Sequence, residues 1–249
     1  MQEGLYDELR SIEEVHWWLT ARRSLLLHFI RRVCRKYAGL PRVLDCGCGT
    51  GLLARQLGEF ARAVGVDDWP HRHPAPGGPP GRCAFLRARI EQLPFGDGAF
   101  DVVCAFDVLE HLDDDRAALR RMHSLLGPGG YLLVSVPAYR FLWDEQDEMA
   151  GHRRRYRLGE IRGELRRAGF SVEKSTYFNT LLFPLVAAVR LARKLQSLAG
   201  AHAAGSDFSL TPPGALNDLL RRVFMAELPL LDRVSLPFGG SILCIARRG

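Results

Sequence analysis

Several features that define whole classes of protein are missing from this chain of 249 residues. The first ten residues are acidic and polar, without the basic and apolar pattern of a signal segment, so we expect no secretion. No apolar run approaches the roughly 20 residues that are needed to cross a bilayer. The six cysteines show no paired spacing, and Cys46 and Cys48 have no second Cys/His pair at ligand spacing. We therefore expect no disulfide framework, no metal site and a reduced, cytoplasmic location.

The chain also has fewer acidic than basic residues, and its net charge is +6. Much of the excess is arginine, clustered at residues 153–155, 166–167, 190–194 and 221–222. Such clusters suit an anionic substrate, nucleic acid or an acidic membrane surface. Solvated helix faces that are rich in arginine are the alternative interpretation.

The most informative segment that is present runs from Val43 to Gly51. Its β-branched and apolar start predicts a strand, and Gly47, Gly49 and Gly51 follow at alternate positions before a segment of helical character. Glycine permits a positive φ and close approach of the backbone to a ligand, and a helix N-terminus offers free N–H groups. Leucines stand where a dinucleotide fold has its last glycine, so we expect a nucleoside cofactor without a pyrophosphate.

Together with the elements after it, this loop resembles motif I of the class I S-adenosylmethionine-dependent methyltransferases. The later elements follow in the order of that family: a second strand that ends in Asp67, Leu-Pro-Phe at 93–95, a strand before Asp-Val-Leu-Glu-His at 107–111, and a glycine-rich turn at 127–130. Pro-Ala-Tyr at 137–139 and Gly-His-x-x-Arg-Tyr at 151–156 are similar to a bacterial branch of type 11 or 23. The resemblance to this branch spans nearly the whole chain.

The resemblance implies one α/β domain over residues 1–249, with a doubly wound, seven-stranded Rossmann-like sheet, N-terminal helices and a helical insertion before the last strand. Within it we expect a helical preface at 1–38, a cofactor-binding core at 39–179, an insertion at 180–237 and the last strand at 238–249. Sequence patterns place later strands at 84–88, 101–106, 131–136, 170–177 and 241–246, and helices at 113–126, 158–168, 180–198 and 212–228. We expect the glycines of 127–130 to end the helix before the fifth strand.

The resemblance also implies the cofactor, S-adenosylmethionine, whose demethylated product is S-adenosylhomocysteine. The loop glycines are expected to form a backbone floor under its methionine part, with Asp45 near the ammonium group and Asp67 on the ribose. Asp45 as an organiser of the loop is the alternative. The expected cofactor-binding residues are Trp18, Arg22, Asp45, Gly47, Cys48, Gly49, Gly51, Asp67, Asp68, Trp69, Ile90, Phe106, Asp107 and His111.

Some positions depart from the family pattern. Arg89-Ile90 replaces a common Asp-Ala, and a guanidinium has only donors, so adenine recognition falls to the Ile90 amide and to stacking. Asp68 stands where an apolar residue is frequent, and Trp69 either supplies the ring contact or covers a gap in the fold. The prolines between Trp69 and Gly81 exclude the usual crossover helix, so we expect a loop that leaves one face of the sheet less covered.

Two N-terminal residues extend the expected cofactor site. Trp18 is expected to close over the cofactor, and Arg22 to pair with its carboxylate through the forked geometry of the guanidinium. Anchoring of the helix to the core by the tryptophans is the alternative interpretation.

His152 and Tyr139 are the candidate catalytic residues, because both follow the fifth strand on the substrate side of this fold. In one interpretation His152 takes a proton from an attacking hydroxyl or amine, since imidazole titrates near neutral pH. In others, His152 and Arg155 fasten the loop to Asp144 or Asp147, or His152 anchors the substrate. We expect in-line methyl transfer to O, N or C of a small or lipid-like bacterial metabolite, with oxygen favoured.

The partners and the role of the insertion stay open at this point. The insertion is interpreted as a lid, as an oligomer interface, or as a peripheral membrane contact through 180–198, and the oligomeric state is undefined. A nucleic-acid methyltransferase is not favoured, because the fourth strand lacks the Asn/Asp-Pro-Pro-aromatic element and no stacking platform interleaves with the basic residues. A cofactor-binding partner protein without catalysis is a rival, and so is a non-methylating reaction that is assisted by the bound sulfonium.

Overall fold

The computed structural model describes residues 9–68, 81–198, 212 and 214–249, and these form two compact units. We call Leu26–Val136, Gly159–Ser175 and Leu243–Gly249 the sheet unit. Met1–Leu25, Pro137–Leu158 and Thr176–Ile242 make up the helical unit. Each unit is thus assembled from three separate stretches of sequence. The expected single domain and its four segments stay a prediction.

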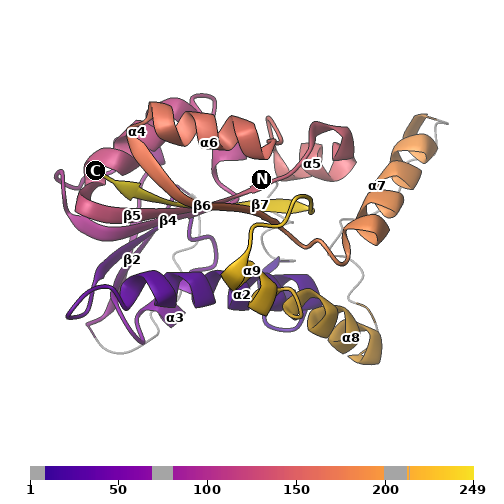
Figure 1. The fold of residues 1–249 in the computed structure, drawn as a ribbon, viewed down its shortest axis with the longest axis horizontal. Coiled ribbons are helices and arrows are strands. Elements are labelled where there is room, and N and C mark those ends of the chain that lie inside the picture. Colours follow the sequence, from indigo (N-terminus) through magenta and orange to yellow (C-terminus); the bar gives the residue numbers. More distant parts are fainter. Residues whose placement is uncertain (1–8, 69–80, 199–211, 213) are drawn as a thin grey trace. The chain divides into compact units, whose positions relative to one another are not determined.

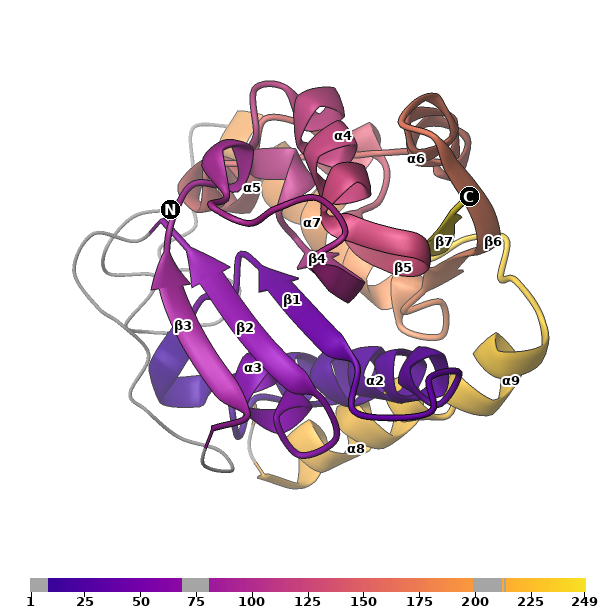
Figure 2. The ribbon, with the colours of Figure 1, turned by 90° about the vertical axis from the view of Figure 1, so that its left-hand side faces the viewer.

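Within the described ranges, seven strands form one sheet in the order β3-β2-β1-β4-β5-β7-β6. The strands are β1 (Arg42–Cys46), β2 (Arg62–Asp67), β3 (Cys83–Arg87), β4 (Phe100–Phe106), β5 (Leu126–Pro137), β6 (Phe170–Phe178) and β7 (Ser241–Arg248). β1 pairs in parallel with β2 and β4, and further parallel pairs join β2 to β3 and β4 to β5. The carboxyl ends of these strands therefore meet at one edge of the sheet (Figure 2). The predicted seven-stranded α/β fold is confirmed.

Helices flank the sheet, as expected for strands that are buried on both faces. The helices are α2 (Trp17–Cys34), α3 (Leu52–Leu57), α4 (Asp115–Leu125), α5 (Glu145–Ala150), α6 (Leu158–Arg167), α7 (Phe183–Leu198), α8 (Gly214–Met225) and α9 (Leu228–Arg233), with short 3-10 turns η1 (Ile90–Gln92), η2 (Leu109–His111) and η3 (Arg140–Leu142). In the sheet unit, α4 and α6 cover one face and α3 lies on the other (Figure 1). Among the described helices, none combines the length and the hydropathy of a membrane span.

Local sequence explains where these helices begin and what they bury. At α4, the Asp114 side chain accepts a hydrogen bond from the Ala117 amide over 2.8 Å, which caps the first turn. The same helix buries an apolar stripe at helical spacing that includes Leu119, Met122 and Leu125. The amphipathic pattern of the sequence is therefore sufficient to place α4 against the sheet.

The glycine-rich segment after α4 corrects one expectation. Residues 127–130 do not form a separate turn, because β5 begins at Leu126, directly after the helix, and includes them. A Cβ on Gly130 would lie 3.0 Å from the Asp101 carbonyl of β4 and 2.9 Å from the Gly127 carbonyl. Glycine is needed there for close approach between strands. The predicted strand at 131–136 is the second part of a longer one.

The insertion before β7 also differs in detail. The helix expected at 212–228 is α8, which ends at Met225; a further helix, α9, follows from Leu228, and Glu227 between the two is buried. The Glu227 side chain accepts a hydrogen bond from the Leu181 amide over 2.8 Å. The expected loop between Trp69 and Gly81 lies, up to residue 80, outside the described residues, so the missing crossover helix stays a prediction.

Candidate active site

The glycine loop after β1 has the backbone conformation that its sequence predicts. Gly47, Gly49 and Gly51 have φ values of 71°, 52° and 78°, in the left-handed region that side chains disfavour. The amides of Gly47 and Cys48 donate to the Val66 carbonyl over 2.7 and 3.0 Å. The loop is thus held against the end of β2, and α3 begins directly after it.

Asp67 closes the other side of this loop. It is the last residue of β2, and its Oδ2 accepts a hydrogen bond from the Gly49 amide over 2.8 Å. A Cβ built on Gly49 would meet nothing within 4 Å, so the backbone there is open to a ligand. The loop and the acidic strand end, which are 18 residues apart in sequence, therefore form one cradle.

The end of β4 lies against the same loop. A Cβ on Gly47 would come within 2.5 Å of Cγ2 of Val108, so no larger residue fits there without rearrangement. Asp107, just before Val108, has a φ of 56°. Its amide donates to the Ser135 carbonyl over 3.0 Å, and its Oδ1 accepts from the Ser135 hydroxyl over 3.1 Å. These bonds to β5 hold a backbone conformation that is unfavourable for aspartate.

The other expected cofactor residues of the sheet unit lie on the strand ends or just after them. Asp45 is buried in β1, Cys48 is half-buried in the loop, and Phe106 is the buried last residue of β4. Asp68 follows β2 and is exposed, Ile90 starts η1 and is buried, and His111 ends η2 and is half-buried. Trp69 lies outside the described residues.

Trp18 and Arg22 belong to the helical unit, on the first turns of α2. The Trp18 ring packs edge-on against Phe224 of α8, with 5.4 Å between ring centroids. This contact anchors the first turns of α2 within the helical unit, in agreement with the alternative interpretation of the sequence. The cofactor roles of Trp18 and Arg22 stay predictions.

The residues of the sheet unit fit S-adenosylmethionine. They offer half-buried backbone with positive φ at Gly49, open space where a Cβ would stand, and the Asp67 carboxylate at a strand end. Glycine loops of this kind accept the close approach of a nucleoside, and a carboxylate at the end of the second strand is suited to ribose hydroxyls. The structure thus places the glycine loop, which is predicted to lie under the methionine part, next to Asp67, which is predicted to bind the ribose.

In the helical unit, His152 is part of a buried charged network centred on Asp147. Oδ1 of Asp147 lies 2.7 Å from Nδ1 of His152 and 2.8 Å from Nε of Arg155. Its Oδ2 accepts a hydrogen bond from Arg190 of α7 over 3.0 Å, and Arg190 also reaches Asp144 over 2.8 Å. The predicted fastening of the loop by His152 and Arg155 is therefore present, with Asp147 as the partner of both.

The charge state of Asp147 follows from these neighbours. Burial alone would raise the pKa of this carboxyl group, because desolvation disfavours the charged form. The hydrogen bond from His152 and the two guanidinium groups outweigh burial and hold the pKa of Asp147 well below its usual range. Asp147 is thus a fixed negative charge at neutral pH.

Tyr139 lies at the centre of an aromatic cluster, which we define as Tyr139, Phe141, Tyr177, Phe183 and Phe238. Its ring stacks on Tyr177 at 5.1 Å and 12°, and its centroid is 5.3 Å from Phe141 and 5.7 Å from Phe183. Burial and the neighbouring Tyr177 phenol raise the pKa of Tyr139, so its hydroxyl stays protonated at neutral pH. We therefore expect Tyr139 to act as a hydrogen-bond donor and an apolar wall, and not as a base.

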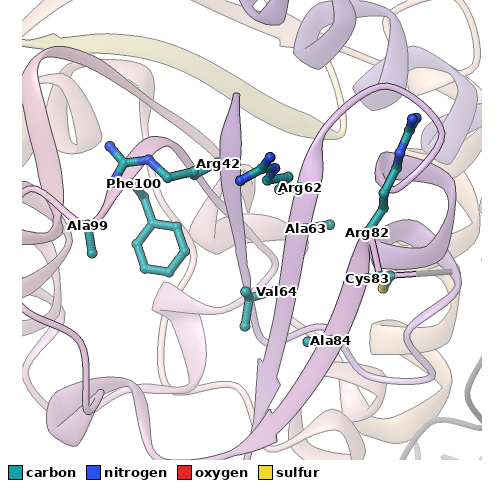
Figure 3. A pocket seen from close by; sticks show the side chains of 10 residues that line it. Arg42, Arg62, Ala63, Val64, Arg82, Cys83, Ala84, Ala99 and Phe100 are labelled. Carbon is teal, nitrogen blue, oxygen red and sulfur yellow. The ribbon is translucent and has the colours of Figure 1, made fainter. Parts of the chain in front are cut away.

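A pocket of about 330 Å³ lies elsewhere in the sheet unit, at the amino ends of β1 to β4 (Figure 3). Its apolar wall includes Val64 and Phe100, and arginines stand at its rim. One of them, Arg42, is paired with Asp101 over 2.9 Å. Because the strands are parallel, this pocket is at the edge opposite to the glycine loop, so it plays no part in the candidate site.

Sequence reasoning missed two contributors to these sites. It did not foresee that Arg190 reaches from the insertion to Asp144 and Asp147, since long-range pairing leaves no local pattern. It also missed the bond from Ser135 to Asp107. The spacing of Asp144 and Asp147 did carry a signal, because the two acids form a capping box at the start of α5.

Comparison with known proteins agrees with this geometry. A family model described as a methyltransferase domain matches residues 18–175. The curated protein named "Probable S-adenosylmethionine-dependent methyltransferase" from Mycolicibacterium smegmatis is 31% identical over 166 residues, which cover 65% of this chain and 62% of that protein. The ubiquinone biosynthesis O-methyltransferase of Azorhizobium caulinodans is 37% identical over 124 residues, covering 46% of this chain and 48% of that one. The chain thus spans about half to three fifths of the length of these relatives.

Solved structures share the fold at low sequence identity. An S-adenosylmethionine-dependent methyltransferase from Mesorhizobium loti aligns with a TM-score of 0.56 and 19% identity, covering 88% of this chain and 96% of that chain. The cyclase SpnF aligns with a TM-score of 0.54 and 20% identity, covering 89% of this chain and 80% of that one. These likenesses show the fold alone.

Proposed function

Because this chain belongs to the methyltransferase domain family, we propose that it transfers a methyl group from S-adenosylmethionine to a small or lipid-like bacterial metabolite. The methyl group goes to oxygen, nitrogen or carbon, and oxygen is the favoured acceptor atom. When bound, the sulfonium cofactor supplies an activated methyl group. The protein mainly has to hold the acceptor in line with it.

The aromatic cluster is the observation that supports a small or lipid-like acceptor. It begins two residues after β5 ends, and its rings include Phe141 and Phe238, which are exposed. Apolar and aromatic walls with a few polar groups are typical of small-molecule sites. Here the hydroxyl of Tyr139 supplies a polar group, while the hydroxyl of buried Tyr177 accepts a hydrogen bond from the Leu158 amide over 3.1 Å. An apolar acceptor that carries one hydroxyl group suits such a wall.

His152 is the proposed general base. The Asp147 carboxylate on Nδ1 favours the tautomer whose proton is on that nitrogen, so that the basic lone pair of the ring is on Nε2, as a general base requires. The same arrangement of a carboxylate that orients an imidazole recurs in enzymes that activate hydroxyl groups. His152 would then accept the proton that the acceptor loses during methyl transfer.

The matched relatives give further support for oxygen and for a lipid-like acceptor. Several of them carry the name ubiquinone biosynthesis O-methyltransferase, although the matched regions cover only part of each protein. We propose no nucleic-acid substrate, since many arginines serve internal ion pairs. Arg155 and Arg190 bind acids of the network, and Arg116 and Arg167 bind Glu164. We further propose the cytoplasm as the compartment, in keeping with six unpaired cysteines.

A turnover assay tests this function. The full chain is incubated with S-adenosylmethionine and with a lipid-linked phenol, a small soluble phenol, a small amine or RNA, and formation of S-adenosylhomocysteine is measured. We expect product with a phenol. We expect Phe141→Ala to raise KM for that acceptor about fivefold, because an aromatic contact is lost. Phe60→Ala, which removes a ring of the sheet unit, is the matched control.

Two results would contradict the proposal. Product formation with RNA alone, together with salt-sensitive binding of RNA, would support the nucleic-acid alternative. Cofactor binding by calorimetry without product from any acceptor would support a non-catalytic partner protein.

A further inference from the structure

Helix α7 presents its apolar residues to solvent and a charged residue to the protein. Its exposed stripe consists of Leu185, Ala188, Val189, Ala192 and Leu195, which lie on one face at helical spacing. Leu185 is 56% exposed and Leu195 is 68% exposed. A helix on the surface of a globular protein normally has the opposite arrangement, with the apolar stripe toward the core.

The inward face of α7 is fixed, so the stripe has no freedom to turn inward. Arg190 donates to Asp144 and Asp147 over 2.8 and 3.0 Å and also to the Leu142 carbonyl over 3.2 Å. At the first turn, the Phe183 ring packs against Tyr139 and Phe238. Rotating the helix to bury its leucines would break these contacts within the helical unit. The exposed stripe is therefore a property of the folded protein.

The charge around the stripe indicates what covers it. Residues 180–198 contain Arg190, Arg193 and Lys194 and no acidic residue. Arg193 and the exposed Lys194 place positive charge on the last turns of the helix. Apolar side chains beside cations are the pattern of helices that lie in the plane of an anionic membrane surface.

A second copy of the chain is a poorer match for this surface. A two-fold interface brings the same patch of both copies together, and residues 180–198 contain no acidic residue that could pair with the cations of the other copy. Anionic lipid headgroups instead neutralise these cations while the acyl region takes up the leucines.

We propose that α7 docks the protein on anionic lipid bilayers, with the apolar stripe in the interface and Arg193 and Lys194 among the headgroups. The docking is peripheral and reversible, because a single amphipathic helix buries little apolar area. It does not depend on which acceptor is methylated.

Vesicle flotation of the full chain tests the proposal. We expect binding to vesicles of phosphatidylcholine with phosphatidylglycerol and much weaker binding to phosphatidylcholine alone. The variant Leu185→Glu/Leu195→Glu is expected to lose at least about tenfold in partition coefficient, since two apolar anchors become charged. Arg193→Gln/Lys194→Gln is expected to lose about 25-fold in partition coefficient on anionic vesicles only, at about fivefold per charge.

The control variant Val15→Glu/Leu40→Glu introduces the same charge at two exposed apolar residues that are not part of α7. We expect it to bind vesicles within about twofold of the unchanged protein, apart from the general effect of its charge. Binding of S-adenosylhomocysteine and thermal unfolding check that each variant is folded.

Three outcomes would overturn the proposal. One is the absence of flotation with anionic vesicles while cofactor binding is intact. Another is equal loss of flotation in the α7 variant and in the control variant. The third is a dimer in analytical ultracentrifugation that Leu185→Glu/Leu195→Glu converts to a monomer, which would assign the stripe to a second copy.

Discussion

The Asp67 carboxylate accepts a hydrogen bond from the Gly49 amide over 2.8 Å. Asp67 is the residue that is predicted to bind the ribose. One oxygen of its carboxylate is therefore already used to shape the glycine loop that the cofactor approaches. Cofactor binding and loop geometry depend on the same side chain, because the carboxylate has a second oxygen that can accept from a hydroxyl.

Replacing Asp67 with asparagine is expected to weaken cofactor binding. The Asp67→Asn side chain can still accept from the Gly49 amide, but it loses the charge that strengthens hydrogen bonds from ribose hydroxyls. Hydrogen bonds to charged groups contribute about 1.5–3 kcal/mol, so we expect the Kd for S-adenosylhomocysteine to rise about 10- to 100-fold in calorimetry. Asp97→Asn, at an acid that is largely exposed, is the control. Equal affinity of Asp67→Asn and the unchanged protein would remove Asp67 from the cofactor site.

Two glycine variants separate folding from ligand access. Gly49→Ala adds a Cβ in open space at a strained φ, so it should cost only about 1 kcal/mol of stability. The added methyl group stands where the cofactor is expected, and we expect affinity to fall at least about tenfold, by analogy with overpacked sites. Gly47→Ala meets Val108 at 2.5 Å and should destabilise the fold itself. Chemical denaturation and calorimetry on both variants distinguish the two effects; loss of stability alone in Gly49→Ala would contradict the assignment.

Removing the charge of Asp147 is expected to destabilise the protein strongly. The Asp147 side chain is fully buried and that of Arg155 is only 4% exposed, so Asp147→Asn leaves a buried guanidinium poorly compensated. Breaking a buried pair from one side typically costs about 3–5 kcal/mol. Urea denaturation measures the loss, with Asp97→Asn expected to change stability by less than about 1 kcal/mol as an exposed pair. A loss of less than about 1 kcal/mol of unfolding free energy for Asp147→Asn would show that the network contributes little to stability.

The same carboxyl group makes stability depend on acid pH. Its pKa in the folded protein lies below the unfolded value of about 3.9, so its stabilising contribution is complete above that pH. The contribution is lost as the pH falls below about 4, because the folded state then binds fewer protons than the unfolded state. We expect the unfolding free energy to fall less steeply with acid in Asp147→Asn than in the unchanged protein. Parallel slopes would exclude Asp147 as the source.

The role of His152 is decided by the pH dependence of the rate. Because His152 is the proposed base, the variant His152→Gln should lower kcat about 100-fold or more and remove the acid limb of the pH–rate profile. Its affinity for the cofactor should be unchanged. His28→Gln changes an imidazole of the sheet unit and serves as the control. Unchanged turnover and an unchanged profile would leave His152 only its bond to Asp147, as a fastening of the loop.

Much of the sheet unit was predictable because its signals are local. The glycine loop, the acid that ends β2 and the apolar strands all follow from backbone sterics and residue periodicity. The start of β5 was not predictable, since the glycines of 127–130 resemble a turn until their close approach to Asp101 of β4 is seen. The network of the helical unit was predictable only in part. His152, Arg155 and Asp147 lie within nine residues of one another, but Arg190 arrives from 43 positions away. The cofactor roles of Trp18 and Arg22 and the catalytic roles of His152 and Tyr139 stay predictions.

The Asp147 side chain takes part in the capping box of α5 and contacts the imidazole of His152. It also accepts a hydrogen bond from Arg190, which connects it to α7. A displacement of α7 therefore cannot be purely local, because it pulls on the anion that orients the imidazole. The proposed docking of α7 and the proposed base role of His152 would therefore be coupled through one carboxylate.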